Sequence, residues 1–198
     1  MIYVEFIRRD RHVPIEIFRA LGDQASWTDP DDALVLNVGR TLRLGPHPAY
    51  MAFWKCKGMA RLDEWEAHFQ SDAGHSDVHE QATHRAIHLI DAGCFDEIVE
   101  GPRADGGLQY VEFLDAPPGA SNQAMAEHFT GRAQRHVPAV LNHVIRRVGL
   151  LGGPRGDMAV WTVADYRALE SLAREAHPDG PYKPRRAGVY RAFGKEIL

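Results

Sequence analysis

Hydrophobic and polar residues alternate along several short stretches of the chain. Residues 2–8 follow this alternation and are rich in β-branched and aromatic side chains, which predicts a strand. Further strands are predicted at residues 33–44, 49–56, 94–100, 108–114, 140–150, 156–163 and 187–193. Helical spacing of apolar residues and helix-end signals predict helices at residues 14–26, 62–70, 77–92, 121–136 and 164–177.

Three short sequences occur twice, in the same order. YVEF stands at residues 3–6 and again at 110–113, an offset of 107. MAFW at 51–54 is matched by MAVW at 158–161 at the same offset, and VLN at 35–37 is matched at 140–142. Such self-similarity indicates an internal duplication. Each half has the order β-α-β-β-α-β, which is the ferredoxin-like motif.

The turn-rich sequence GPRADGG at residues 101–107 separates the two halves. We expect a first ferredoxin-like repeat at residues 1–102 and a second at residues 107–198. The predicted fold class is α+β, with the two antiparallel sheets packed as an α/β barrel. We expect the functional pocket where these sheets meet.

The duplicated architecture and its repeated YVEF and MAxW sequences resemble the dimeric α/β-barrel superfamily. Its two sheets pack face to face, either between chains or within a duplicated chain. The sequence EHFTGRAQRHVPAV is similar to the helix signature of the EthD-like group, and Phe129, His136 and Pro138 match that signature. The resemblance implies a small-molecule enzyme. Superfamily members include small monooxygenases, polyketide cyclases, muconolactone isomerases, haem-degrading proteins and haem peroxidases.

Strand alternation predicts two faces for the first strand of each half. Val4 and Phe6 share one face, which we assign to the helices, so Tyr3 and Glu5 would face the pocket. Tyr110 and Glu112 hold the same positions in the second half. A carboxyl in an enclosed space is a candidate general base, so Glu5 and Glu112 are predicted catalytic residues. The alternative is that each glutamate pairs with an arginine at the rim, such as Arg40 or Arg43.

Other residues are predicted to bind the substrate. Trp54 and Trp161 stand at matching positions and would line the cavity with Tyr3 and Tyr110, which favours a flat, largely apolar ligand. Ordinary core packing is the alternative. Arg40 and Tyr50 lie around the second and third strands, where a cation would suit a carboxylate or phenolate substrate.

His136 is the third predicted catalytic residue. It shares a helix face with Met125, Phe129 and Ala133, and its helix is expected to end there because Pro138 follows. The end of a helix favours imidazolium over imidazole, so His136 can act as an acid or a base. The alternative is a partly buried histidine with satisfied hydrogen bonds.

The segment HSDVHEQATHRAIH suggests a metal site, but its spacing does not favour one. His75 and His79 can share a helix face, whereas His84 and His88 lie on roughly the opposite side. HEQATH also differs from the H-E-x-x-H motif, because its second histidine comes five residues after the first. We predict no metal, and leave open whether His75 and His79 bind one.

Composition narrows the function classes. The formal net charge is -4 and no basic patch dominates, which argues against a nucleic-acid partner. The two cysteines require no oxidising compartment, and no apolar run reaches the length of a membrane span. A cytoplasmic protein is expected. Sequences of the G-x-G-x-x-G, Walker and G-x-S-x-G types are absent, and no cofactor is predicted.

Three functions follow from this reasoning. The leading one is a cofactor-independent lyase, isomerase or cyclase acting by acid/base chemistry on a small aromatic or polyketide-like substrate. The second is a monooxygenase or a haem-dependent enzyme on the same fold. The third is a non-catalytic barrel that binds a small ligand. A homodimer is also expected, because exposed strand edges can pair between chains.

Overall fold

Eight strands form one closed barrel in the computed structural model of this protein. The structure describes residues 1–9, 33–45, 49–69, 87–102, 106–136, 138–152, 156–175 and 181–192. The first half contains β1 (Ile2–Arg9), β2 (Ala33–Arg40), β3 (Tyr50–Lys55), α2 (Ala60–Phe69) and β4 (Ile87–Glu100). The second half contains β5 (Leu108–Asp115), α5 (Asn122–Arg135), β6 (Ala139–Gly152), β7 (Asp157–Val163), α6 (Tyr166–Glu175) and β8 (Lys183–Ala192).

The strand order repeats the ferredoxin-like arrangement twice. Around the barrel the order is β1-β3-β2-β8-β5-β7-β6-β4, and each of the eight pairings between neighbouring strands is antiparallel. Each half therefore forms a four-stranded unit, and the halves join where β2 meets β8 and where β4 meets β6. The predicted α+β barrel is confirmed.

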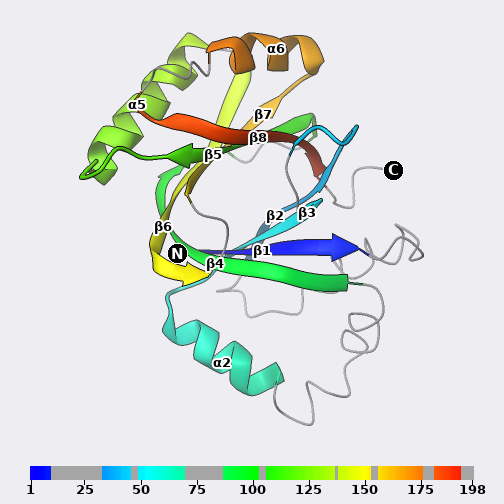
Figure 1. Cartoon of the computed structure of the whole chain (residues 1–198), viewed down its shortest axis with the longest axis vertical. Coiled ribbons are helices and arrows are strands. Elements are labelled where there is room, and N and C mark those ends of the chain that lie inside the picture. The colour runs from blue at the N-terminus through cyan, green and yellow to red at the C-terminus, as the bar shows by residue number, and fades with distance from the viewer. Residues whose placement is uncertain are drawn as a thin grey trace.

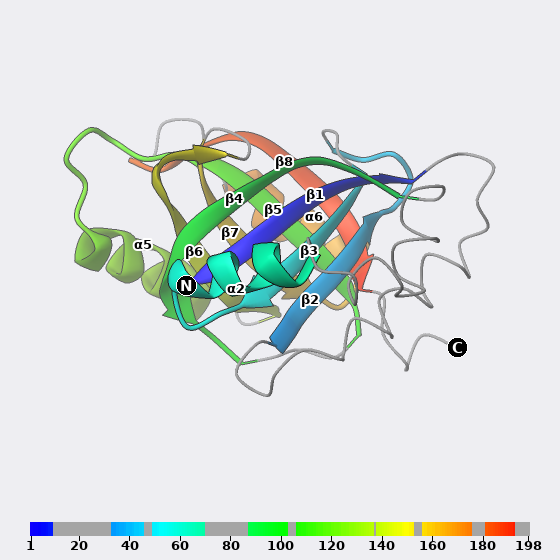
Figure 2. The same cartoon turned by 90° about the horizontal axis from the view of Figure 1, so that it is seen from below.

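The described helices lie outside the barrel. Figure 1 shows α5 and α6 over the sheet of the second half, and α2 on the opposite side against the first half. Figure 2, seen from below, shows α2 crossing in front of the first-half strands. α5 begins after Ser121, whose side chain accepts a hydrogen bond from the Ala124 backbone and so caps the helix. None of the described helices is long and apolar enough to span a membrane.

Two predicted elements differ from the structure. Residues 87–92 belong to strand β4 rather than to a helix, because they pair with β1 from Glu5 to Arg9. Strand β2 ends at Arg40, since Leu42 and Arg43 turn the chain with φ values of 49° and 57°. The predicted helix at residues 14–26, and residues 77–86 of the other helix, lie outside the described residues.

The assignment of the strand faces is wrong. The Val/Phe face points into the barrel, where Val4, Phe6, Val111 and Phe113 belong to one buried cluster built from both halves. Tyr110 instead packs with Met125 and Phe129 of α5 in a second cluster beneath the helices. The space between the two sheets is therefore hydrophobic core. The Tyr/Glu faces lie outside the barrel wall, under the helices.

Candidate functional site

The sequence repeat appears in the structure as two copies of one hydrogen-bonded unit, which we call the Trp–Glu motif. In the first copy Tyr3 lies opposite Trp54, and Trp54 Nε1 donates to Glu5 Oε2 at 2.8 Å. In the second copy Tyr110 lies opposite Trp161, and Trp161 Nε1 donates to Glu112 Oε2 at 3.0 Å. Ala52 and Ala159 lie opposite the two glutamates. The two copies thus share one backbone frame.

Arg132 of α5 closes the second copy. Its Nη1 donates to Glu112 Oε2 at 2.7 Å and its Nη2 donates to Glu112 Oε1 at 3.1 Å. The same Nη2 donates to the Leu172 carbonyl at 3.0 Å, and the guanidinium carbon lies 4.9 Å from the Trp161 ring centroid. Glu112 and Trp161 are 0% exposed. Glu112 is therefore a structural ion-pair partner, and its predicted role as a catalytic base is not supported.

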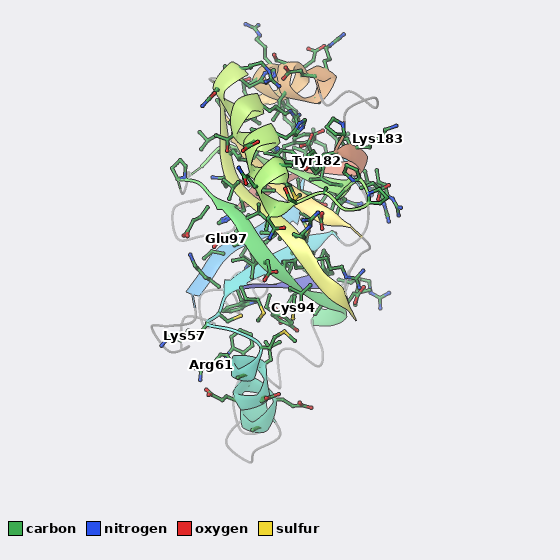
Figure 3. All side chains as sticks on the ribbon, turned by 90° about the vertical axis from the view of Figure 1, so that its left-hand side faces the viewer. Lys57, Arg61, Cys94, Glu97, Tyr182 and Lys183 are labelled. Atoms are coloured by element: carbon green, nitrogen blue, oxygen red, sulfur yellow. The ribbon has the colours of Figure 1, made fainter. Side chains whose placement is uncertain are left out.

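The first copy is more open. Tyr3, Glu5 and Trp54 are all partly exposed, in contrast to their buried counterparts Tyr110, Glu112 and Trp161. Trp65 of α2 forms one wall, with its ring centroid 5.8 Å from that of Tyr3 and 6.1 Å from that of Trp54, both edge to face. Figure 3 shows Cys94 in the same layer between the sheet and α2. The first copy therefore presents a carboxyl group beside three aromatic rings.

The first copy also differs in charge. The described residues give Glu5 one hydrogen bond, from Trp54, and no cation. Burial raises the pKa of Glu5, and the hydrogen bond from Trp54 opposes this only in part. A carboxylate with a raised pKa is a stronger base than an ordinary one, so the residue type and its surroundings suit proton transfer.

An unused acceptor lies on the same face as Glu5. Ala52 of β3 pairs with Glu5 of β1 on one side and with Asn37 of β2 on the other. Only this alanine therefore lies between the Glu5 and Asn37 side chains across the sheet. Asn37 is 8% exposed, and its Oδ1 accepts no hydrogen bond from the described residues. A buried oxygen without a partner is uncommon and points to a missing donor.

The other predicted site residues lie elsewhere. His136 caps the C-terminal end of α5, and its Nε2 contacts the Glu175 carboxylate of α6, so it joins two helix ends. Arg40 donates to the Gly45 carbonyl at 2.8 Å in the turn after β2. Tyr50 accepts a hydrogen bond from Arg9 Nε at 3.1 Å. None of these contacts involves Glu5.

The sequence analysis missed a polar cluster at the join between β4 and β6. Glu97 Oε1 and His143 Nδ1 lie 2.8 Å apart, and Lys55 Nζ lies 3.3 Å from Glu97 Oε2 and 2.7 Å from Glu100 Oε2. The register shifts on both strands beside this pair. Burial alone would raise the pKa of Glu97, but His143 and Lys55 together lower it. The cluster therefore links the two halves by charge.

The metal prediction can be tested only in part. Within the described residues, no group of three or more His, Cys, Asp or Glu side chains can hold a metal ion. His75, His79 and His84 lie outside the described residues, as does the His88 side chain.

Comparison with known proteins gives structural matches only. No protein-family model matches this chain, and no curated protein matches it. A mutant chlorite dismutase from Candidatus Nitrospira defluvii, in complex with cyanide, is 10% identical with a TM-score of 0.55, covering 98% of this chain and 90% of its own. A protein from Lactobacillus acidophilus NCFM assigned as a monooxygenase is 10% identical with a TM-score of 0.60, covering 98% of this chain and 93% of its own.

The chain shares the fold of these two proteins. This confirms the expected barrel architecture, whereas the closer likeness to the EthD-like group stays a prediction. The leading expectation of a lyase, isomerase or cyclase is wrong: the neighbours are a chlorite dismutase and a monooxygenase, which favour the oxygenase alternative. Two of the three predicted acid/base residues are also engaged in other contacts, Glu112 with Arg132 and His136 with Glu175.

The haem version of that alternative requires a planar slot and an axial ligand. Between the second-half sheet and its helices, Met125, Phe129 and Trp161 are 0–1% exposed and leave no such slot among the described residues. Beside the first copy, the contacts described for Glu5, Tyr3 and Trp54 include no histidine, which is the axial ligand in globins and peroxidases. The described residues therefore do not fit a porphyrin.

Proposed function

We propose that this protein is a monooxygenase that oxidises a small aromatic molecule at the first copy of the Trp–Glu motif without a porphyrin. The observation that carries the proposal is the partly exposed Glu5 carboxyl beside the rings of Tyr3, Trp54 and Trp65. Aromatic walls suit a flat substrate, and a single carboxyl suits the removal of one proton from it.

The proposed reaction needs no external reductant. Glu5 takes the proton from a phenol O–H or from the protonated form of an aromatic amine, which leaves the ring electron-rich. A ring C–H opposite that group then reacts with dioxygen: one oxygen atom becomes a ring carbonyl and the other leaves as water. The substrate loses two hydrogen atoms, gains one oxygen atom and supplies all four electrons that dioxygen accepts. The product is a quinone or a quinone imine.

Dioxygen uptake tests this proposal. Purified protein is incubated with a panel of phenols and aromatic amines that are unsubstituted opposite the polar group, and oxygen consumption is followed with an electrode. We expect uptake with at least one of them, with one quinone or quinone imine formed for each dioxygen consumed.

Two variants show where the reaction occurs. Glu5→Gln is expected to lower the rate by roughly a hundredfold or more, as for loss of a general base. Glu170→Gln, on the exposed face of α6, is the matched control and is expected to leave the rate unchanged. Equal rates in wild type and Glu5→Gln, or no uptake with any phenol or amine, would contradict the proposal.

A further inference from the structure

The second copy of the Trp–Glu motif shows what kind of group the motif holds. Its carboxylate and its indole together enclose one planar cation, the Arg132 guanidinium. The two Nη atoms make the hydrogen bonds to Glu112 and to the Leu172 carbonyl, whereas Nε has no partner among the described residues. Two N–H groups on nitrogens that share one carbon are therefore sufficient to bond both carboxylate oxygens. An amidinium has such a pair of nitrogens.

The first copy repeats the frame without the cation. The Trp54–Glu5 hydrogen bond and the position of Ala52 match those of the second copy. No described side chain occupies the place that Arg132 takes beside Glu112, and Tyr3, Glu5 and Trp54 are partly exposed. The same acceptor and the same aromatic face are thus available to a ligand from solution.

Asn37 provides a second reason to expect a nitrogen ligand. Asn37 pairs with Ala52 in the first copy, and Val144 pairs with the matching Ala159 in the second copy. Val144 has no polar side chain. In the first copy this position is Asn37, whose buried Oδ1 lacks a donor among the described residues. A carboxylate and an amide oxygen on one face both accept N–H groups, so this face is built to receive donors.

We propose that the first copy of the Trp–Glu motif binds a nitrogen cation attached to an aromatic ring, either a planar amidinium or guanidinium or the protonated form of an aromatic amine. A planar cation bonds to Glu5 as Arg132 bonds to Glu112 and lays its π-face on Trp54, whereas an ammonium bonds to Glu5 through its one nitrogen. In both cases the aromatic ring extends toward Trp65 and Tyr3. This inference rests on the proposed function in one respect: the cation is taken to be the polar group of the substrate that is oxidised. The binding itself requires no turnover.

Calorimetric titration of the full chain tests the inference. The probe is benzamidine, which carries an amidinium on an aromatic ring, and the matched neutral probe is benzamide, which has nearly the same shape. We expect benzamidine to bind with one site and benzamide to bind roughly ten- to a hundredfold more weakly, because it lacks the charge-assisted hydrogen bonds. Equal binding of the two probes, or no binding of benzamidine, would overturn the inference.

Variants assign the binding to this copy. Glu5→Gln keeps the acceptor for Trp54 but removes the charge, and it is expected to weaken benzamidine binding by roughly ten- to a hundredfold. Glu170→Gln, a carboxylate on the surface of α6, is the control and is expected to bind as the wild type does. Unchanged binding in Glu5→Gln would show that the cation binds elsewhere and would overturn the inference.

The inference and the proposed function can fail separately. If benzamidine binding depends on Glu5 but no aromatic amine causes dioxygen uptake, the binding site is supported and the oxygenase is contradicted. If dioxygen uptake depends on Glu5 but is no faster with amines than with phenols, the oxygenase is supported and the binding of a cation is contradicted.

Discussion

Glu5 and Glu112 occupy the same position in two copies of one motif, yet their surroundings give them different roles. Glu112 is fully buried and bonded to Arg132 by both carboxylate oxygens. Glu5 is partly exposed, and the described residues offer it only the Trp54 indole. A duplication supplies two identical starting sites, and a single arginine is enough to turn one of them into a structural contact.

This difference predicts unequal effects of the same substitution on stability at the two sites. Glu112→Gln leaves the buried Arg132 without its counter-charge and is expected to lower the free energy of unfolding by about 3–5 kcal/mol. Glu5→Gln removes a carboxylate whose burial is unfavourable and keeps an acceptor for Trp54, so a change within about 1 kcal/mol is expected. Urea unfolding of both variants measures this. Equal losses would contradict the assigned roles.

The raised pKa of Glu5 predicts how ligand binding depends on pH. The carboxylate form binds a cation, and this form is lost as the pH falls through the pKa of Glu5. Because burial raises that pKa above its ordinary value of 4.5, benzamidine affinity should decline at a pH above 4.5 on acidification. Titrations between pH 7 and pH 4 check this. An affinity that stays constant down to pH 4 would exclude Glu5 as the binding group.

The sequence carries a signal for the buried position of Arg132. Met125, Phe129 and Arg132 are spaced four and three residues apart, and all three are buried on one face of α5. An arginine on an apolar helix face indicates a buried acceptor opposite it. The EthD-like signature instead matches His136 on the same helix, and this residue contacts Glu175 at the helix end.

Strands β4 and β6 meet at the join between the two halves, and their contacts include the Glu97–His143 pair. This pair could not be predicted from the sequence, because its members are 46 residues apart and irregular register on both strands decides where they point. Alternation predicts which side chains share a face of a regular strand. Where the register is interrupted, the side chains beyond the interruption can point to the other face.

Acidification should weaken this join. The pKa of Glu97 is lowered in the folded protein, so its contribution to stability is present above the ordinary value of 4.5 and is lost as the pH falls through the lower folded value. Glu97→Gln is expected to cost about 1–3 kcal/mol at pH 7 and progressively less below pH 4.5. Urea unfolding of both proteins across this range measures the difference. A cost independent of pH would contradict the charge link.

At the scale of the whole molecule, the repeats predicted the architecture but not the side of the sheet that carries the site. The equal offsets of YVEF and MAxW correspond to the equal registers of β1 with β3 and of β5 with β7. In a closed barrel covered by helices, both faces of a strand are buried, so neither the Val/Phe nor the Tyr/Glu pattern identifies the interior. Packing between elements distant in sequence decides it.

The tryptophan indoles provide the most direct test of the claim that only the first copy binds a ligand. The chain has four tryptophans, so a nitrogen–proton correlation spectrum shows four indole signals, which Trp54→Phe and Trp161→Phe variants assign. Addition of benzamidine should shift the Trp54 signal and leave the Trp161 signal in place, because Arg132 already occupies the second copy. A shift of the Trp161 signal, or no shift of the Trp54 signal, would contradict the account.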